Sequence, residues 1–165
     1  KRFCREVAEC NISWLEEPVV PDDKRGMAEV RASTDVPIST GESEFTRFAF
    51  RDLAELRACD IFQPDLSICG GVTEAMRIEA IASAYQLRYA PHLWGGALTF
   101  AAGLHTLVVA STGFIVEYSL GANPMLHELA VEDFTVVDGH LDVPDRPGLG
   151  VTVDEAFVEK YRVTD

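Results

Sequence analysis

Short apolar runs alternate with longer amphipathic stretches along the chain. Most of the runs are rich in β-branched or aromatic residues, as expected for strands that are buried on both faces. The five apolar runs are Ile12–Leu15, Val36–Thr40, Ile61–Pro64, Arg88–Pro91 and Phe114–Val116. The stretches between them, such as residues 45–59 and 73–87, place their apolar residues at helical spacing. This alternation predicts an α/β fold in which about five parallel strands are joined by helices.

Two details of the pattern refine this prediction. Gly70-Gly71 and Gly95-Gly96 fall where a strand must turn into a helix. Residues 98–116 contain no charged residue and approach the length of a membrane span. Polar and glycine interruptions, at Gly103, His105 and residues 111–113, instead favour a buried helix, a turn and a buried strand.

One ionisable residue lies at or near the end of each predicted strand. These residues are Glu16, Glu42, Asp65, His92 and Glu117, and the intervals between them are 26, 23, 27 and 25. In a closed (β/α)-barrel the carboxyl ends of the strands converge on one mouth, where catalysis occurs. Five such groups at one mouth cost stability through burial and repulsion unless a cation or a function compensates. The spacing therefore predicts a shared site.

Each of these residues also has a simpler interpretation. A single glutamate at a strand end is often a charge that faces a loop, and His92 could be a hydrogen-bonded core histidine. Glu17 and Glu44 show the simpler case, because each lies near a candidate without sharing the strand-end position. The regular spacing of all five residues is what favours the shared site.

The residue types suit proton abstraction beside a carboxylate. Glu16 and Glu42 offer hard oxygen ligands to Mg²⁺, and no thiol or histidine beside them favours zinc. Asp65 and His92 lie on neighbouring strands, so the carboxylate can fix the imidazole tautomer and raise its basicity. Glu117, one strand further along, can hydrogen-bond a substrate carboxylate and, if protonated, donate to a developing enolate.

Several motifs together resemble the mandelate racemase and muconate lactonizing enzyme branch of the enolase superfamily. They are Trp14-Leu15-Glu16-Glu17-Pro18, Thr40-Gly41-Glu42, Gln63-Pro64-Asp65 with Gly70-Gly71-Val72-Thr73-Glu74, Pro91-His92 and, near the end, Pro147-Gly148-Leu149-Gly150. The resemblance implies the C-terminal part of a (β/α)-barrel and a Mg²⁺ cofactor. It implies that Glu16 and Glu42 are metal ligands and that His92 is the base or acid, paired with Asp65. It implies that Glu117 contacts the substrate carboxylate and stabilises an enediolate.

The chain also departs from the family pattern. The first metal-ligand acid and the lysine-bearing strand would lie upstream of Glu16, and the capping domain is absent. We expect a partial barrel domain over residues 1–126. Residues 127–165 are expected to form a C-terminal tail, with a hairpin at Phe134–Val143, that would pack on the missing cap. Five strands cannot close an eight-stranded barrel, so an open sheet edge is expected. The chain is either cut from a longer enzyme, which we favour because it opens inside a predicted helix, or a short protein whose edge a partner or its own copy covers.

Composition limits the possible partners. Hydrophobic residues make up 47% of the 165 residues, enough for a core, and the net charge of −13 disfavours nucleic acid. The four cysteines form no C-x-x-C pair, and their scatter suggests buried thiols in a reducing compartment. Composition therefore favours a cytoplasmic protein that contacts neither nucleic acid nor membrane. The resemblance implies that it acts on a small carboxylate, a sugar acid, and we expect a homo-oligomer.

Three functions stay open at this point. The first is dehydration of a sugar acid, which Tyr118 and Asn123-Pro124 favour weakly because they resemble dehydratase-like members more than cycloisomerases. The second is racemisation or epimerisation through the same intermediate, which needs a second base that the upstream lysine strand would supply. The third is an inactive fragment or assembly scaffold.

Overall fold

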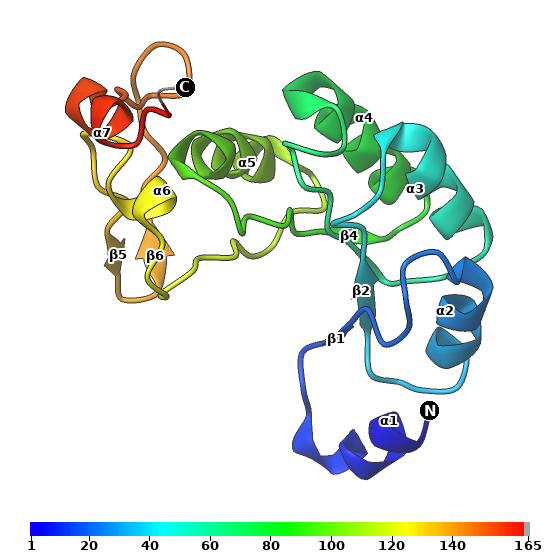
Figure 1. Ribbon diagram of the computed structural model, residues 1–165. Helices are drawn as coiled ribbons and strands as arrows, with labels where there is room; N and C mark the ends of the chain where they lie inside the picture. Colours follow the sequence, from blue (N-terminus) through cyan, green and yellow to red (C-terminus); the bar gives the residue numbers. More distant parts are fainter. Residues whose placement is uncertain (164–165) are drawn as a thin grey trace.

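A four-stranded parallel sheet forms the centre of the computed structural model, which describes residues 1–163. Its strands are β1 (Leu15–Glu16), β2 (Ile38–Thr40), β3 (Ile61–Phe62) and β4 (Arg88–Tyr89), and they lie side by side in chain order (Figure 1). All four strands pair in parallel, three lie within predicted apolar runs, and β1 overlaps the end of the first run by one residue. The α/β class, the strand order and the parallel pairing are therefore confirmed.

The structure corrects the prediction of a fifth strand. The run Phe114–Val116 is not a strand, and its neighbourhood meets β4 only through a single bridge between Tyr89 and Gly113. The backbone N–H of Tyr89 donates to the carbonyl of Thr112 at 3.0 Å, and the ladder continues no further. Within residues 1–163 the segment lies beside β4 at the edge of the sheet, and its backbone turns away after this one bridge, so no second pair of residues forms a ladder.

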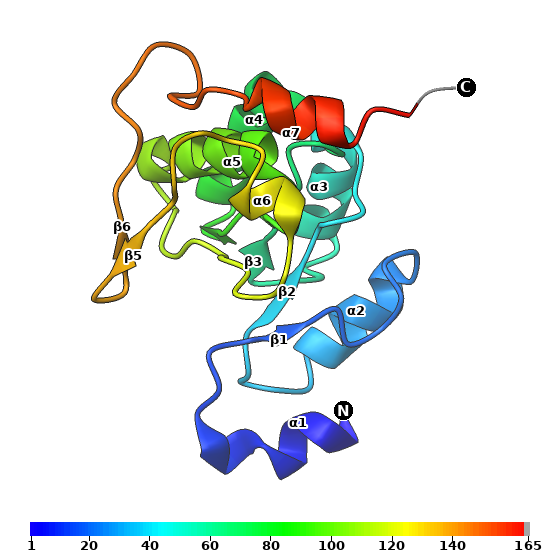
Figure 2. The same ribbon diagram turned by 60° about the vertical axis from the view of Figure 1, so that its left-hand side comes forward.

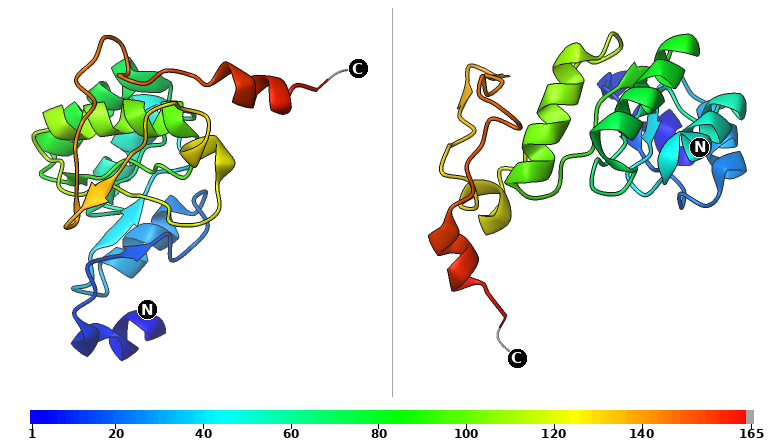
Figure 3. Two further views of the ribbon diagram at one scale, coloured as in Figure 1. Left: turned by 90° about the vertical axis from the view of Figure 1, so that its left-hand side faces the viewer. Right: turned by 90° about the horizontal axis from the view of Figure 1, so that it is seen from above.

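Four helices connect and cover the strands. They are α2 (Lys24–Arg31), α3 (Thr46–Glu55), α4 (Gly71–Ala84) and α5 (Ala97–Val109). Figure 3 shows these helices following one another in an arc along the outer side of the strands. Fully buried side chains from both layers form the core between them: Met27, Ile38, Phe50, Phe62 and Ile78. The glycine pairs stand at the starts of α4 and α5, as expected.

The region that resembled a membrane span folds differently. Its helical part is α5, 13 residues long and packed on both sides, and a turn follows at Ser111-Thr112. Among residues 1–163 no helix combines the length and the apolar character that crossing a bilayer requires.

The chain begins with short helices that precede the sheet. These are α1 (Arg2–Glu6) and the 3₁₀-helix η1 (Ala8–Cys10), and they lie at the opposite end of the molecule from the tail (Figure 2). All four cysteines are free. Cys4, Cys59 and Cys69 are buried, but Cys10 is exposed, so the expectation of buried thiols is wrong for that residue. The 3₁₀ turn that carries Cys10 buries none of its side chains.

The tail packs on the far side of α5. It contains α6 (Pro124–His127), the antiparallel pair β5 (Val136–Val137) and β6 (His140–Leu141), and α7 (Glu155–Lys160). The predicted hairpin is thus present, and it turns at Asp138 and Gly139, which both have positive φ. The Phe134 ring lies 4.6 Å from the Phe100 ring of α5, centroid to centroid. The boundary at 126/127 and the packing against a capping domain stay predictions.

At the amino-terminal ends of the strands, Asp60 joins three elements. One carboxylate oxygen accepts hydrogen bonds from the Nε and Nη2 atoms of Arg31, at 2.9 and 2.7 Å, and the other accepts from the backbone N–H of Ile38 at 2.9 Å. We expect Asp60→Ala to lower the free energy of unfolding by roughly 1–3 kcal/mol, because it leaves a backbone donor and a charge without their acceptor. Urea denaturation would measure this loss, and an unchanged midpoint would contradict it.

Candidate active site

The five predicted site residues lie at the carboxyl ends of the strands. Glu16 is the last residue of β1, and Glu42, Asp65 and His92 follow β2, β3 and β4 within three residues. A parallel bridge between Asp65 and His92 extends the pairing of β3 with β4 beyond the strands themselves. Glu117 follows the segment that touches the edge of β4. Since the strands are parallel, all five positions are at the same end of the sheet.

Asp65 and His92 form a hydrogen-bonded pair. His92 Nδ1 lies 2.9 Å from Asp65 Oδ2, and the other oxygen of Asp65 accepts from both the backbone N–H and the hydroxyl of Ser67. Burial raises the pKa of Asp65, but the hydrogen bonds from His92 and Ser67 outweigh it and hold that pKa below its ordinary value. An ionised Asp65 therefore accepts the Nδ1 proton, which leaves the Nε2 lone pair of neutral His92 available.

The second ring nitrogen of His92, Nε2, points to another carboxylate. His92 Nε2 lies 3.4 Å from Glu42 Oε2. The hydrogen bond to Asp65 raises the pKa of His92 against partial burial, and the charges of Glu117 and Glu42 raise it further. Burial raises the pKa of Glu42, as do the charges of Glu17, Glu16 and Glu117, while His92 lowers it. Glu42 and His92 are thus in contact, and the charges of Glu16 and Glu117 act on this pair.

Glu16 and Glu117 have different partners. Glu16 is exposed, and its Oε2 accepts from Gln63 Nε2 at 2.8 Å and from Trp14 Nε1 at 3.3 Å. Glu117 Oε2 accepts from the backbone N–H of Leu93 at 2.7 Å, directly after His92 in the chain. Glu117 thus acts as a hydrogen-bond acceptor, and this contact holds it near the Asp65–His92 pair. A protonated Glu117 that donates to substrate stays a prediction.

The side chains partly fit a divalent cation. The carboxylates of Glu16 and Glu42 are the oxygen donors that Mg²⁺ prefers. Within residues 1–163 no group of three or more His, Cys, Asp or Glu side chains is arranged to hold a metal ion. The buried Oε1 of Gln63, next to Glu16, has no hydrogen-bond partner in the same part of the chain. Glu16 and Glu42 thus supply part of a site for a hard cation, and their role as ligands stays a prediction.

Neighbouring charged residues have structural contacts. Glu17, whose backbone is left-handed with φ at 39°, accepts from the Thr40 hydroxyl at 2.8 Å and approaches the backbone N–H of Gly41 at 3.4 Å. Glu44 pairs with Lys24 at 2.5 Å. These contacts agree with the simpler interpretation of Glu17 and Glu44. Sequence reasoning missed the contacts of Lys24 and Gln63, because no motif spacing links residues that lie far apart in the chain. It also missed the bond from Trp14 to Glu16, although side chains two residues apart on a strand lie on the same face of the sheet.

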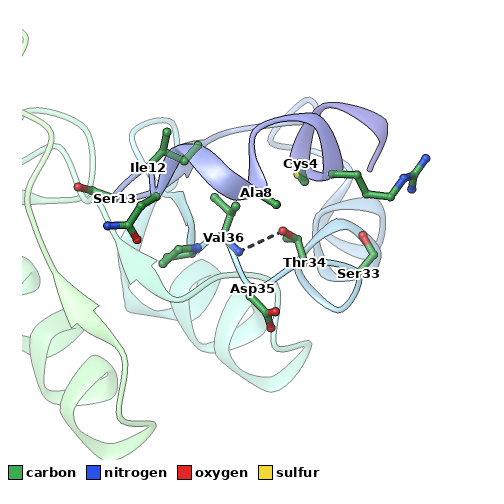
Figure 4. Close-up of a pocket in the computed structure, with 11 residues that line it drawn as sticks. Cys4, Ala8, Ile12, Ser13, Ser33, Thr34, Asp35 and Val36 are labelled. Atoms are coloured by element: carbon green, nitrogen blue, oxygen red, sulfur yellow. Dashed lines mark hydrogen bonds between the residues drawn. The ribbon is translucent and has the colours of Figure 1, made fainter.

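A hollow of about 660 Å³ lies elsewhere, between η1 and the segment leading into β2. Figure 4 shows Cys4, Ala8 and Ile12 on one side of it and Thr34, Asp35 and Val36 on the other. It opens near the amino-terminal ends of the strands, opposite the ionisable cluster. Because barrel enzymes carry their chemistry at the carboxyl ends, this hollow is not the candidate site.

The pH dependence of stability should report the Asp65–His92 pair. The folded pKa of Asp65 is lowered, so its stabilisation is present above the unfolded carboxyl pKa and is lost as pH falls through the folded value. The folded pKa of His92 is raised, so its stabilisation is present below the unfolded imidazole pKa and is lost as pH rises through the folded value.

We therefore expect His92→Asn to destabilise the metal-free chain most between about pH 4 and pH 6.5. The difference from the wild-type chain should shrink toward pH 9. Urea denaturation of both chains across this range would measure it. A difference that stays constant with pH would show that the charged pair contributes nothing.

Parallel strands, outer helices and one ionisable group after each strand define the C-terminal part of a (β/α)-barrel of the type that carries its active site at the carboxyl ends of the strands. Residues 1–157 match the family described as enolase C-terminal domain-like. The chain belongs to the enolase superfamily, in its mandelate racemase and muconate lactonizing enzyme branch.

Relatives with known names agree with this assignment. The chain is 39% identical to D-galactonate dehydratase of Ralstonia pickettii over 96% of its own length and 43% of the relative's. The crystal structure of 3,6-anhydro-D-galactonate cycloisomerase from Zobellia galactanivorans matches with a TM-score of 0.90 and 35% identity, over 96% of this chain and 45% of that one. A mandelate racemase/muconate lactonizing enzyme from Jannaschia sp. CCS1 matches with a TM-score of 0.91 and 32% identity, over 99% and 42%. The chain thus spans less than half the length of these relatives.

Proposed function

We propose that the protein abstracts the proton next to a substrate carboxylate, with Mg²⁺ as cofactor, and that the substrate is a sugar acid. The observation that carries this proposal is the hydrogen-bonded pair of Asp65 and His92, with His92 Nε2 facing the carboxylate cluster. An imidazole whose other nitrogen is held by an ionised carboxylate is a suitable general base near neutral pH.

Each residue then has a definite task. Asp65, fixed by Ser67, keeps the proton of His92 on Nδ1 and orients the ring. His92 accepts the substrate proton at Nε2, and the substrate becomes an enediolate. Glu117, whose Oε2 accepts from the Leu93 N–H, would contact the substrate carboxylate. Glu16 and Glu42 would hold Mg²⁺, which supplies Lewis-acid stabilisation of the charge that develops on that carboxylate.

Dehydration is the outcome that we propose. After His92 has taken the proton, the enediolate expels the hydroxyl on the adjacent carbon, which receives a proton from the His92 imidazolium and leaves as water. The resulting enol tautomerises to a 2-keto acid. D-galactonate dehydratases among the relatives favour this reaction. Cycloisomerases are also among them, which keeps isomerisation as the alternative. Racemisation or epimerisation would need a second base opposite His92.

A hybrid protein would test the proposal. Joining this chain to the upstream half of the Ralstonia pickettii relative would supply the remaining barrel strands. Incubation with Mg²⁺ and a panel of sugar acids should yield keto acid, while inversion or cyclisation without loss of water would support isomerisation. The parent dehydratase is the control. A folded hybrid that transforms none of these acids would contradict the proposal and favour a scaffold role.

A further inference from the structure

Gln63 links two strands that are not neighbours. It directly follows β3, its side chain is only 5% exposed, and its Nε2 donates to Glu16 Oε2 on β1 at 2.8 Å. Strand β2 lies between them in the sheet. The amide therefore reaches across the face of β2 to meet a residue 47 positions away in the sequence.

The amide can have only one orientation there. A carboxylate accepts hydrogen bonds and cannot donate them, so the N–H₂ end must face Glu16. Its Oε1 is then buried without a partner in residues 1–163, as is the Oγ of Ser39. Ser39 is the register partner of both Glu16 and Ile61, so it lies on the same face of the sheet as Glu16 and Gln63. Leaving a polar atom unpaired inside a protein is unfavourable, so any stabilising contribution of Gln63 comes from its N–H₂ group.

That group acts on a side chain that would otherwise be free to turn. Glu16 is exposed, and a glutamate side chain loses much rotamer freedom when it is fixed. Gln63 Nε2 and Trp14 Nε1 both donate to Oε2. Two donors on one oxygen fix the carboxylate plane and leave Oε1 of Glu16 as the oxygen that can bind something else.

We infer that Gln63 is a positioning residue that holds Glu16 as a ligand for a divalent cation. This inference rests on the proposed function, because it assumes a cation at Glu16 and Glu42. Hydrogen bonds that orient metal-ligating side chains typically change metal affinity about 10–100-fold when they are removed. The effect of Gln63 should therefore be on affinity, whereas its effect on folding should be small.

The first test needs no metal. In ¹H–¹⁵N spectra of this chain, the side-chain amide of Gln63 and the indole N–H of Trp14 report their bonds to Glu16. Both resonances should move in Glu16→Gln, because the charged acceptor is replaced by a neutral one. If neither resonance moves, the contact does not exist in solution. The inference about Gln63 is then overturned, independently of the result of the metal-binding test.

The second test uses Mn²⁺ alone, because its unpaired electrons broaden nearby resonances even when binding is weak. The Trp14 indole signal should broaden at half-saturating Mn²⁺ concentrations about tenfold or more higher in Gln63→Met than in the wild-type chain. Methionine keeps the shape and removes the N–H₂ group. The exposed Gln86→Met is the matched control and should titrate like the wild type.

The outcomes separate the two ideas. Equal Mn²⁺ titrations for wild type and Gln63→Met overturn the role of Gln63 and leave the proposed metal site intact. Absence of broadening both in the wild-type chain and in the wild-type hybrid protein, which has the upstream strands as well, removes both. Weakened binding together with an unchanged melting temperature supports the inference, since a purely structural role would lower the melting temperature and leave the affinity alone.

Discussion

Replacing His92 with asparagine should lower the rate of proton abstraction by about 10²–10⁴-fold in the hybrid enzyme. Asparagine can still hydrogen-bond to Asp65, but it offers no basic nitrogen near neutral pH. Its effect on Mg²⁺ affinity should be small, because His92 faces Glu42 without being one of the predicted ligands. Exchange of the substrate α-proton with solvent deuterium, followed by NMR, would measure the step directly.

A matched control separates loss of the base from loss of a histidine. His127→Asn changes an exposed histidine whose Nε2 contacts the carbonyl of Gly121, in the tail. It should exchange the α-proton like the wild-type hybrid. If His92→Asn kept the rate within about tenfold, equivalent to about 1.4 kcal/mol of barrier, His92 would not be the base.

The main effect of Glu42→Gln should be weaker binding of Mg²⁺. The substitution keeps the shape but removes the negative charge, and a neutral amide is a much poorer partner for Mg²⁺ than a carboxylate. We expect the dissociation constant of the hybrid for Mg²⁺ to rise about tenfold or more, which corresponds to about 1.4 kcal/mol or more. Isothermal calorimetry would measure it, and excess Mg²⁺ should restore part of the activity.

Glu44→Gln, the same substitution two residues further along the chain, is the control for Glu42→Gln. Glu44→Gln removes the charge of a buried carboxylate that is paired with Lys24 instead of facing the cluster. It should lower stability and leave Mg²⁺ affinity close to that of the wild type. Equal losses of affinity in the two variants would mean that Glu42 acts only through the net charge of the loop and not as a ligand.

The ends of the strands could be predicted because short apolar runs alternate regularly with amphipathic stretches along the chain. Burial on both faces marks a parallel strand in the sequence, and the residue after it must lie at the carboxyl end. Asp65 and His92 were expected to meet because neighbouring strands are about 4.8 Å apart. Their contact at 2.9 Å confirms that proximity.

Other features depend on partners that the pattern does not reveal. Phe114–Val116 has the composition of a strand, but a strand also needs successive ladder hydrogen bonds to a neighbour, and only Gly113 meets β4. The Phe114 ring instead lies under the guanidinium of Arg88, 3.3 Å from its centroid. The bond from Gln63 to Glu16 crosses an intervening strand, so no sequence spacing could suggest it.

The backbone at Gly41 joins the carboxyl end of the sheet to the hydrophobic core. Gly41 has φ at +135°, and a β-carbon there would lie 2.6 Å from the Phe50 ring of α3. Glu42 is the next residue. A side chain at position 41 would therefore meet the Phe50 ring and would also hold a backbone conformation that L-residues rarely adopt. A smaller residue at position 50 would remove the collision but not the backbone strain, so we expect related sequences to keep glycine at position 41 even where position 50 varies.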